Sequence, residues 1–213
     1  RIRSKLARKS KIKMAELFIE LFSEEIPAKL QIDAREKIQK SINESLQKKE
    51  ISFKKSKSFS TPTRLAIFLD GIPEKIEQKK KTIKGPKVEA PQAALDGFIK
   101  SNNLIKSNVY KKKIEKGEFY FAETKPKTID VLKELQSIIP NALQNYSWKK
   151  SMKWSSHDLT WGRPLKSIIA LFNSRVINFN FFHLKSDNLI LIEGLNDTKL
   201  KKISGFKTYL NYL

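Results

Sequence analysis

Cysteine is missing from this chain of 213 residues, which excludes disulfide bonds and thiolate–metal sites. A run of about 18 apolar residues, which a membrane-spanning helix requires, is missing too. The basic start RIRSKLARKSKIK is not followed by a long apolar region with a small-residue cleavage site, so no secretory signal is predicted. We therefore expect a cytoplasmic protein that does not act at a membrane.

Glycine is scarce, with seven residues, and these form neither the G-x-G-x-x-G nor the G-x-x-x-x-G-K-S/T pattern that cradles phosphate. His157 and His183 are far apart in sequence and have no clustered carboxylates around them, which argues against a metal site. Ser156, His157 and Asp158 are consecutive, whereas the groups of a catalytic triad converge in space from separate positions. The sequence therefore predicts no catalytic residue, no metal and no cofactor in this chain.

Arginine is rare among the basic residues, although the formal net charge is +21. Of the 43 basic residues, only those at positions 1, 3, 8, 35, 64, 163 and 175 are arginine. Arginine makes bidentate contacts with phosphates and bases, whereas lysine acts as a point charge. The charge still attracts polyanions, so nucleic acid is the first partner class to consider. The run Lys79–Lys81 is expected to contribute only diffuse charge.

The first regular stretch is residues 16–22, where apolar side chains alternate with the period of a strand that has one buried face. Short strands are also expected at residues 51–59 and 64–70, the latter closed by Gly71 and Pro73.

A long helix is expected to follow the first strand, with Ser23 as its cap and Glu24, Glu25 and Pro27 in its first turn. Carboxylates at that end stabilise the helix dipole, and adjacent helical residues do not face each other, so this role is favoured over an acid–base pair. Apolar residues recur every four positions to about Lys49: they are Ile26, Leu30, Ala34, Ile38, Ile42 and Leu46.

The rest of the chain predicts shorter elements. We expect a loop at Gly85–Pro86, a short helix at 93–99, a hairpin over 109–123 that turns at Lys116–Gly117, a helical segment over 129–146 that Pro140 splits or kinks, and a last strand over 179–184. Beyond Ser186 no periodicity is evident.

All three tryptophans, Trp148, Trp154 and Trp161, fall in a basic stretch that extends to Phe182. Apolar rings with cations between them suit a surface that binds nucleic acid or a partner protein. The same pattern is typical of a β-rich core segment with a solvated rim, and periodicity leaves both interpretations open.

These elements predict an α+β fold, with a mixed or antiparallel sheet, long amphipathic helices packed on it and a small helix-plus-hairpin insertion. The predicted regions are a basic disordered arm (1–13), a core α+β body (14–75 with 147–186), an inserted or second small α+β region (76–146) and the truncated start of a following region (187–213).

Several short motifs occur in a defined order along the chain: Glu-Glu-Ile-Pro-Ala at 24–28, Thr-Pro-Thr-Arg-Leu-Ala at 61–66, Lys-Gly-Pro at 84–86, EKGEFYFAE at 115–123, KSMKW at 150–154 and Arg-Pro-Leu at 163–165. In this order they closely resemble motifs of the beta subunit of bacterial heterotetrameric glycyl-tRNA synthetase. Thr63 stands where that family has arginine. Residues 189–194 replace a Gly-His-Arg-Phe element, as after a local frame disturbance.

The resemblance implies a non-catalytic, tRNA-binding part of glycine–tRNA ligase. In that family the alpha subunit holds the class II catalytic domain that activates glycine with ATP and Mg, and two alpha chains assemble with two beta chains. The implied partners are therefore the alpha subunit and tRNA(Gly). The candidate contact residues are Glu24, Glu25, Arg64, Lys84, Lys150, Lys153, Trp154 and Arg163. Arg64→Ala and Arg163→Ala are expected to weaken tRNA binding while the fold stays intact.

A full beta subunit of that family is several times longer and carries a C-terminal anticodon-binding region, so the resemblance implies a truncated fragment. Two alternatives stay open from the sequence: a free-standing basic RNA-binding module, and a decayed, non-functional gene remnant. Co-purification with a glycine-activating alpha chain distinguishes the beta-subunit fragment from the free-standing RNA-binding module. Cooperative thermal unfolding of residues 14–184 would argue against the remnant.

Overall fold

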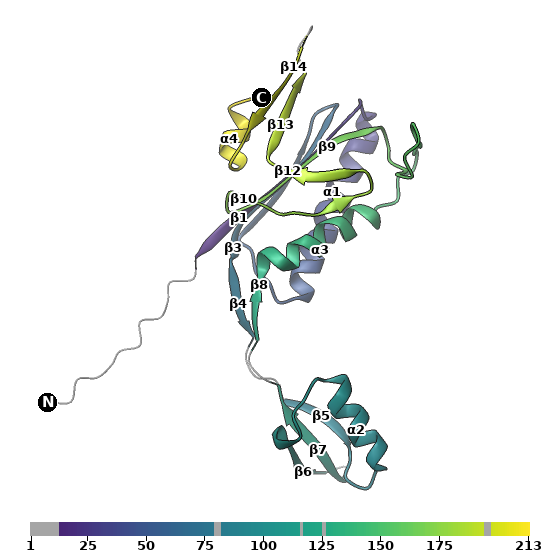
Figure 1. Ribbon diagram of the computed structural model, residues 1–213, viewed down its shortest axis with the longest axis vertical. Helices are drawn as coiled ribbons and strands as arrows, with labels where there is room; N and C mark the ends of the chain where they lie inside the picture. The colour runs from purple at the N-terminus through teal and green to yellow at the C-terminus, as the bar shows by residue number, and fades with distance from the viewer. Residues whose placement is uncertain (1–12, 79–81, 116, 125–126, 194–196) are drawn as a thin grey trace, which may run out of the picture. The chain divides into compact units, whose positions relative to one another are not determined.

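The chain forms two compact units in the computed structural model, which describes residues 13–78, 82–115, 117–124, 127–193 and 197–213. Unit 1 comprises residues 1–76 and 130–213, and unit 2 comprises residues 77–129 (Figure 1). The helix that the sequence grouped with the insertion, within 76–146, belongs to unit 1. The predicted arm, apart from Lys13, and the run Lys79–Lys81 lie outside the described residues.

A seven-stranded sheet forms the centre of unit 1, with strand order β11-β12-β9-β1-β3-β2 and β10 paired to β9. Its strands are β1 (Met14–Ser23), β2 (Lys55–Ser60), β3 (Arg64–Pro73), β9 (Leu165–Phe172), β10 (Arg175–Val176), β11 (Asn180–Phe181) and β12 (Leu184–Asp187). β12 runs parallel to β9 and the other pairings are antiparallel. The α+β prediction is confirmed, with mixed and antiparallel sheets.

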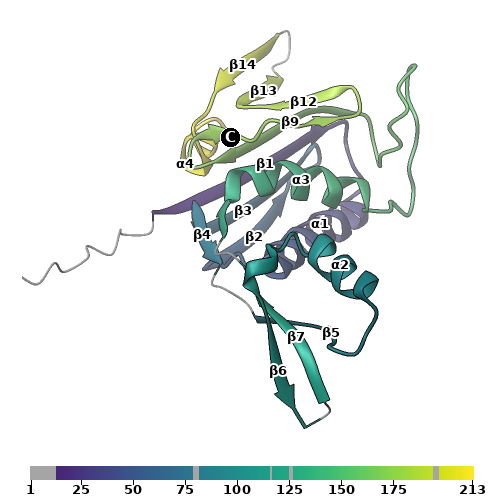
Figure 2. The same ribbon diagram turned by 60° about the horizontal axis from the view of Figure 1, so that its bottom comes forward.

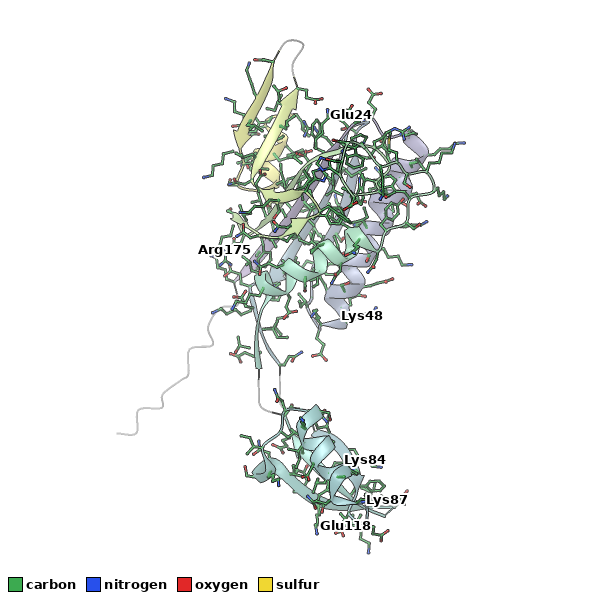
Figure 3. The ribbon with its side chains drawn as sticks, turned by 45° about the vertical axis from the view of Figure 1, so that its right-hand side comes forward. Glu24, Lys48, Lys84, Lys87, Glu118 and Arg175 are labelled. Carbon is green, nitrogen blue, oxygen red and sulfur yellow. The ribbon has the colours of Figure 1, made fainter. Side chains whose placement is uncertain are left out.

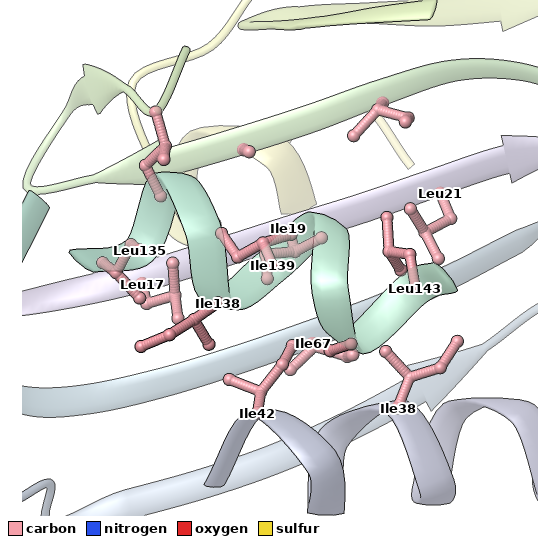
Figure 4. Packing of buried hydrophobic residues seen from close by; sticks show 14 of the residues in the cluster. Leu17, Ile19, Leu21, Ile38, Ile42, Ile67, Leu135, Ile138, Ile139 and Leu143 are labelled. Atoms are coloured by element: carbon pink, nitrogen blue, oxygen red, sulfur yellow. The ribbon is translucent and has the colours of Figure 1, made fainter. Parts of the chain in front are cut away.

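Side chains of β1 alternate between the two faces of this sheet because successive residues of a strand point to opposite sides. Leu17, Ile19 and Leu21 are buried on the face that packs against α1 (Ala28–Lys48) and α3 (Val131–Gln144). Figure 4 shows these leucines and isoleucines between the two helices and the sheet. This layer forms the larger hydrophobic core of the molecule.

The opposite face of the sheet is also covered, by β13 (Leu189–Glu193) and α4 (Phe206–Leu210), and β14 (Thr198–Lys202) pairs with β13. Phe18 of β1 packs against the ring of Tyr209, with centroids 4.6 Å apart, and Ile190 is fully buried. No periodicity was evident in the sequence beyond Ser186, and the structure corrects that interpretation. Here strands and a helix complete the second, smaller core.

The expected cap and first turn of the long helix are wrong, and the helix that contains Pro140 is not split. Ser23 is the last residue of β1, and α1 begins at Ala28 after Pro27, with no side-chain cap and no acidic residue in its first turn. Glu24 and Glu25 therefore precede the helix rather than occupy its first turn. Pro140 lies inside α3, which continues from Val131 to Gln144 without being split.

Unit 2 is a three-stranded antiparallel sheet with one helix (Figure 2). Its elements are β5 (Thr82–Lys87), α2 (Gln92–Ser101), the 3-10 turn η1 (Lys106–Asn108), β6 (Val109–Ile114) and β7 (Gly117–Glu123). The predicted hairpin is confirmed by the pairing of Ile114 with Gly117. The expected loop at Gly85–Pro86 is instead part of β5, beside a register shift between Lys84 and Lys87.

Two short strands, β4 (Lys75–Gln78) and β8 (Lys127–Asp130), pair with each other where the chain passes between the units. Among the described residues, every helix is too short or too polar to cross a membrane.

Candidate functional site

Three motifs that are far apart in sequence meet at one end of the unit 1 sheet, where β1 ends and β3 and β9 begin. The antiparallel register places Phe22 opposite Arg64 and Ser23 opposite Leu165. Three backbone hydrogen bonds join the segments: Ser23 N donates to Thr63 O (2.9 Å), Glu24 N to Pro164 O (3.0 Å) and Ile26 N to Pro62 O (2.8 Å). We call residues 23–28, 61–66 and 162–166 the motif junction.

Glu24 lies at the surface of this junction (Figure 3). Its carboxylate is 2.8 Å from Lys166 Nζ, and Glu193 contacts the same ammonium at 2.7 Å. The hydrogen bond to Glu193 and, to a smaller extent, the one to Glu24 raise the pKa of Lys166. Glu25 is exposed. Glu24 and Glu193 hold Lys166 at the surface, and ion pairs so exposed contribute little to stability.

Arg64 points into the protein, on the face of the sheet covered by β13 and α4. Its side chain is 10% exposed and donates to Glu20 Oε2 at 2.8 Å, while its second terminal nitrogen donates to the carbonyl of Leu191. Burial raises the pKa of Glu20, and the charge of Arg64 and the hydroxyl of Tyr209 offset part of that rise. The guanidinium of Arg64 also stands 4.3 Å from the centroid of the Phe22 ring. Arg64 therefore has an internal, structural role.

Two of the three tryptophans are core residues. Trp148 and Trp161 are 8% and 2% exposed, and their rings meet edge to face with centroids 5.1 Å apart. Gly162 allows this packing, because a Cβ on it would lie 2.4 Å from the Trp148 ring. The core interpretation of this stretch is therefore correct for these two rings.

The loop before Gly162 carries the exposed cations. Lys150 and Lys153 are exposed, and Trp154 is half-buried. The bridge between Met152 and Trp161 folds this loop back toward the motif junction, because the two residues exchange backbone hydrogen bonds of 2.8 and 3.2 Å. The structure thus places a basic loop next to the junction.

Arg163 belongs to the junction itself and is partly exposed. It donates to the carbonyl of Gly162 at 2.8 Å. Unlike Arg64, Arg163 forms no ion pair with a carboxylate of the described residues. Its charge is therefore available at the surface. Lys84 belongs to unit 2, whereas the other candidate residues belong to unit 1.

The sequence did not anticipate that the two histidines meet. The rings of His157 and His183 stack with centroids 3.6 Å apart and an interplanar angle of 6°, and Trp154 approaches His183 edge-on at 6.1 Å. Burial, and then the nearby charge of His157, lower the pKa of His183. The part of the chain that the structure describes contains no group of three or more His, Cys, Asp or Glu side chains suited to a metal ion. The spacing of two isolated histidines carried no signal for their contact.

A family model described as "Glycyl-tRNA synthetase beta subunit" matches residues 17–213. The chain belongs to this family. Two relatives named "Glycine--tRNA ligase beta subunit" come from Rickettsia bellii (strain OSU 85-389) and Rickettsia prowazekii (strain Madrid E). They are 37% identical over 196 residues and 36% identical over 200 residues, which is 92% and 94% of this chain. The chain spans 30% of the length of each of these relatives.

The match to the glycyl-tRNA synthetase beta subunit family extends past the segment 189–194 to residue 213. Within that segment β13 contributes the buried Ile190 and the carbonyl that accepts from Arg64. The sheet of unit 1 and its C-terminal cover are therefore one folded body in this chain.

Proposed function

We propose that this chain is the tRNA-binding, non-catalytic beta-subunit part of a glycine–tRNA ligase, the enzyme that attaches glycine to tRNA(Gly) with ATP. The observation that carries the proposal is the motif junction: segments 23–28, 61–66 and 162–166 converge at one end of a sheet, beside a basic loop. The exposed lysines of that loop suit contact with the phosphates of RNA.

The partners in this proposal are an alpha subunit and tRNA(Gly), in an assembly of two alpha and two beta chains. ATP and Mg belong to the alpha subunit, whose active site makes the bond to glycine. The proposed location is the cytoplasm, where translation consumes the charged tRNA.

The contact surface is formed by Lys150, Lys153 and Arg163, with Trp154 beside them. These cations neutralise phosphates of the tRNA backbone, which fixes position without reading sequence. Trp154 is half-buried, so it offers one ring edge or face to a nucleotide. Glu24 and Glu25 suit contact with a basic patch of the alpha subunit rather than with RNA. Arg64 is not one of the proposed contact residues, because its guanidinium forms an ion pair in the interior of the protein.

The experiment compares tRNA(Gly) binding by the chain and by Lys150→Gln/Lys153→Gln, over a series of salt concentrations. If both lysines contact phosphates, the variant binds more weakly and the slope of log K against log salt falls by about 2. Glycylation is measured in parallel with a glycine-activating alpha subunit, tRNA(Gly), glycine and ATP, with and without the chain.

Lys201→Gln/Lys202→Gln is the matched control, because it removes the same charge from two exposed lysines of β14. An equal loss in both variants would mean that net charge, not this loop, binds the tRNA. Glycylation by the chain without an alpha subunit would contradict the non-catalytic role. Failure to bind either tRNA(Gly) or an alpha subunit would contradict the proposal as a whole.

A further inference from the structure

The three-stranded sheet of unit 2 has one packed face. β7 is its central strand, paired with β5 on one side and β6 on the other. Residues directly opposite each other in antiparallel strands share a face. Ala122 is opposite both Ile83 and Val109 and is fully buried. This face therefore holds the small core of unit 2.

The other face combines aromatic rings with lysines. In the central strand, Phe119 is opposite Lys112 on one side and Lys87 on the other, and Phe121 is opposite Tyr110 and Lys84. The register shift in β5 keeps both of its lysines on this face, although they are three positions apart. We call Lys84, Lys87, Tyr110, Lys112, Phe119 and Phe121 the aromatic face. Its three lysines and its tyrosine are exposed, and both phenylalanines are half-buried.

Contacts within the aromatic face place cations over rings. Lys84 Nζ lies 3.6 Å from the centroid of Phe119, and Lys112 Nζ lies 5.9 Å from that of Phe121. The rings of Tyr110 and Phe121 stack with centroids 6.2 Å apart and an interplanar angle of 24°. Tyr110 is 42% exposed, so one side of this stacked pair is open to solvent. Figure 3 shows the labelled side chains of Lys84 and Lys87 on unit 2.

The charge of this face is complementary to a polyanion. It carries three lysines, and the one carboxylate found there by the same register is Glu123, at its end opposite Thr82. Rings that are open on one side bind planar groups by stacking, and lysines beside them neutralise phosphates. Double-stranded RNA hides its bases inside the helix, whereas an unpaired strand offers both bases and phosphates at once.

We propose that the aromatic face is a binding site for unpaired RNA, in which bases stack on Tyr110 and Phe121 and Lys84, Lys87 and Lys112 contact the phosphates. Binding is tolerant of sequence because every base has a face to stack. The site belongs to unit 2, whereas the motif junction belongs to unit 1, and it requires neither an alpha subunit nor tRNA(Gly).

The test is fluorescence anisotropy of the full chain with a labelled oligouridine of about 12 nucleotides, a length within the site sizes of single-strand binding folds. The variant is Lys112→Gln/Phe121→Leu. We expect its affinity to fall about tenfold or more through the lost stacking, and the salt slope to fall by about 0.7 for the lost phosphate contact.

The opposite face supplies a matched control. Lys111 and Tyr120 form a cation–ring pair at the same 5.9 Å separation as Lys112 and Phe121, but with side chains on the other face. Lys111→Gln/Tyr120→Leu should leave the affinity within about twofold. Equal losses in the two variants, or no loss in either, would overturn the proposal. The first result would mean that the charge of the whole chain binds RNA, and the second that this face binds none.

A second variant keeps the test valid if Lys112→Gln/Phe121→Leu does not fold. Tyr110→Leu alters an exposed ring only, and binding is followed by the fluorescence of an oligouridine that contains one 2-aminopurine. Stacking on Tyr110 quenches this base, so the variant should show less quenching than the unmodified chain at saturation. Undiminished quenching would also overturn the proposal. A paired duplex of the same length should compete less well than the single strand.

Discussion

The buried pair of Arg64 and Glu20 gives the sharpest prediction about stability. Glu20 is fully buried, and Arg64 is its ion-pair partner at 2.8 Å. Arg64→Met would remove the guanidinium and leave a carboxylate inside the protein without a compensating charge. Breaking a buried pair in this way costs about 3–5 kcal/mol. That is a large fraction of the ~5–15 kcal/mol that stabilises a typical protein.

The loss in Arg64→Met should depend on pH. Burial already raises the pKa of Glu20 above its ordinary value, and removing Arg64 raises it further because the largest opposing influence is gone. A raised pKa means that the folded state holds the proton more tightly than the unfolded state does. The variant therefore regains stability as the pH falls through the folded-state pKa of Glu20, and its deficit is greatest above that value.

Urea unfolding followed by tryptophan fluorescence measures this effect on unit 1, because all three tryptophans lie in that unit. The double variant Glu20→Gln/Arg64→Met removes both charges and should recover more than half of the loss. The reasoning is refuted if Arg64→Met costs less than about 1 kcal/mol at neutral pH, or if the double variant is no more stable than the single one. A folded Arg64→Met that loses tRNA binding would restore the contact role expected from the sequence.

Three further predictions concern packing, titration and binding. Gly162→Ala places a Cβ 2.4 Å from the Trp148 ring, so urea unfolding should show a loss of about 1–3 kcal/mol, and an unchanged midpoint would mean that the ring moves aside freely. Burial raises the pKa of Asp187. The stability that the protonated carboxyl of Asp187 contributes is therefore lost as the pH rises through its folded-state pKa. Asp187→Asn keeps an acceptor for Leu189 N, which lies 2.9 Å away, and should be more stable than the wild type at neutral pH but not in acid. An advantage independent of pH would contradict this cause. Arg163→Ala should weaken tRNA(Gly) binding with an unchanged unfolding midpoint, whereas Arg175→Ala, which removes an exposed arginine outside the junction, should bind as the wild type does; equal losses would remove Arg163 from the site.

The early part of the fold was predictable because two hydrophobic periods follow one another. Alternation over residues 16–22 and a four-residue spacing up to Leu46 correspond to β1 and α1. The boundary between them was not predictable from capping residues alone. Ser23 is a common cap, but here it extends β1 by pairing with Leu165, and the helix begins only after Pro27.

The C-terminal cover and the role of Arg64 could not be predicted from the sequence, for two different reasons. All five residues of β14 are exposed, so that strand shows no alternation of apolar and polar side chains. The partners of Arg64 are Glu20 and the carbonyl of Leu191, which lie far from it along the chain. Only the folded sheet shows that an arginine at the start of a strand faces inward.

The order in which the chain is synthesised has a consequence for unit 1. The elements β13 and α4, which cover one face of the sheet, leave the ribosome after every strand that they cover. Until then Phe18 and the Glu20–Arg64 ion pair are exposed to water, and an exposed ion pair stabilises a protein only weakly. When Ile190 and Tyr209 pack onto the sheet, they exclude water. The charges of Glu20 and Arg64 are then buried, and each needs the other as its partner. The nascent domain therefore completes its folding only when its last strands and helix have left the exit tunnel.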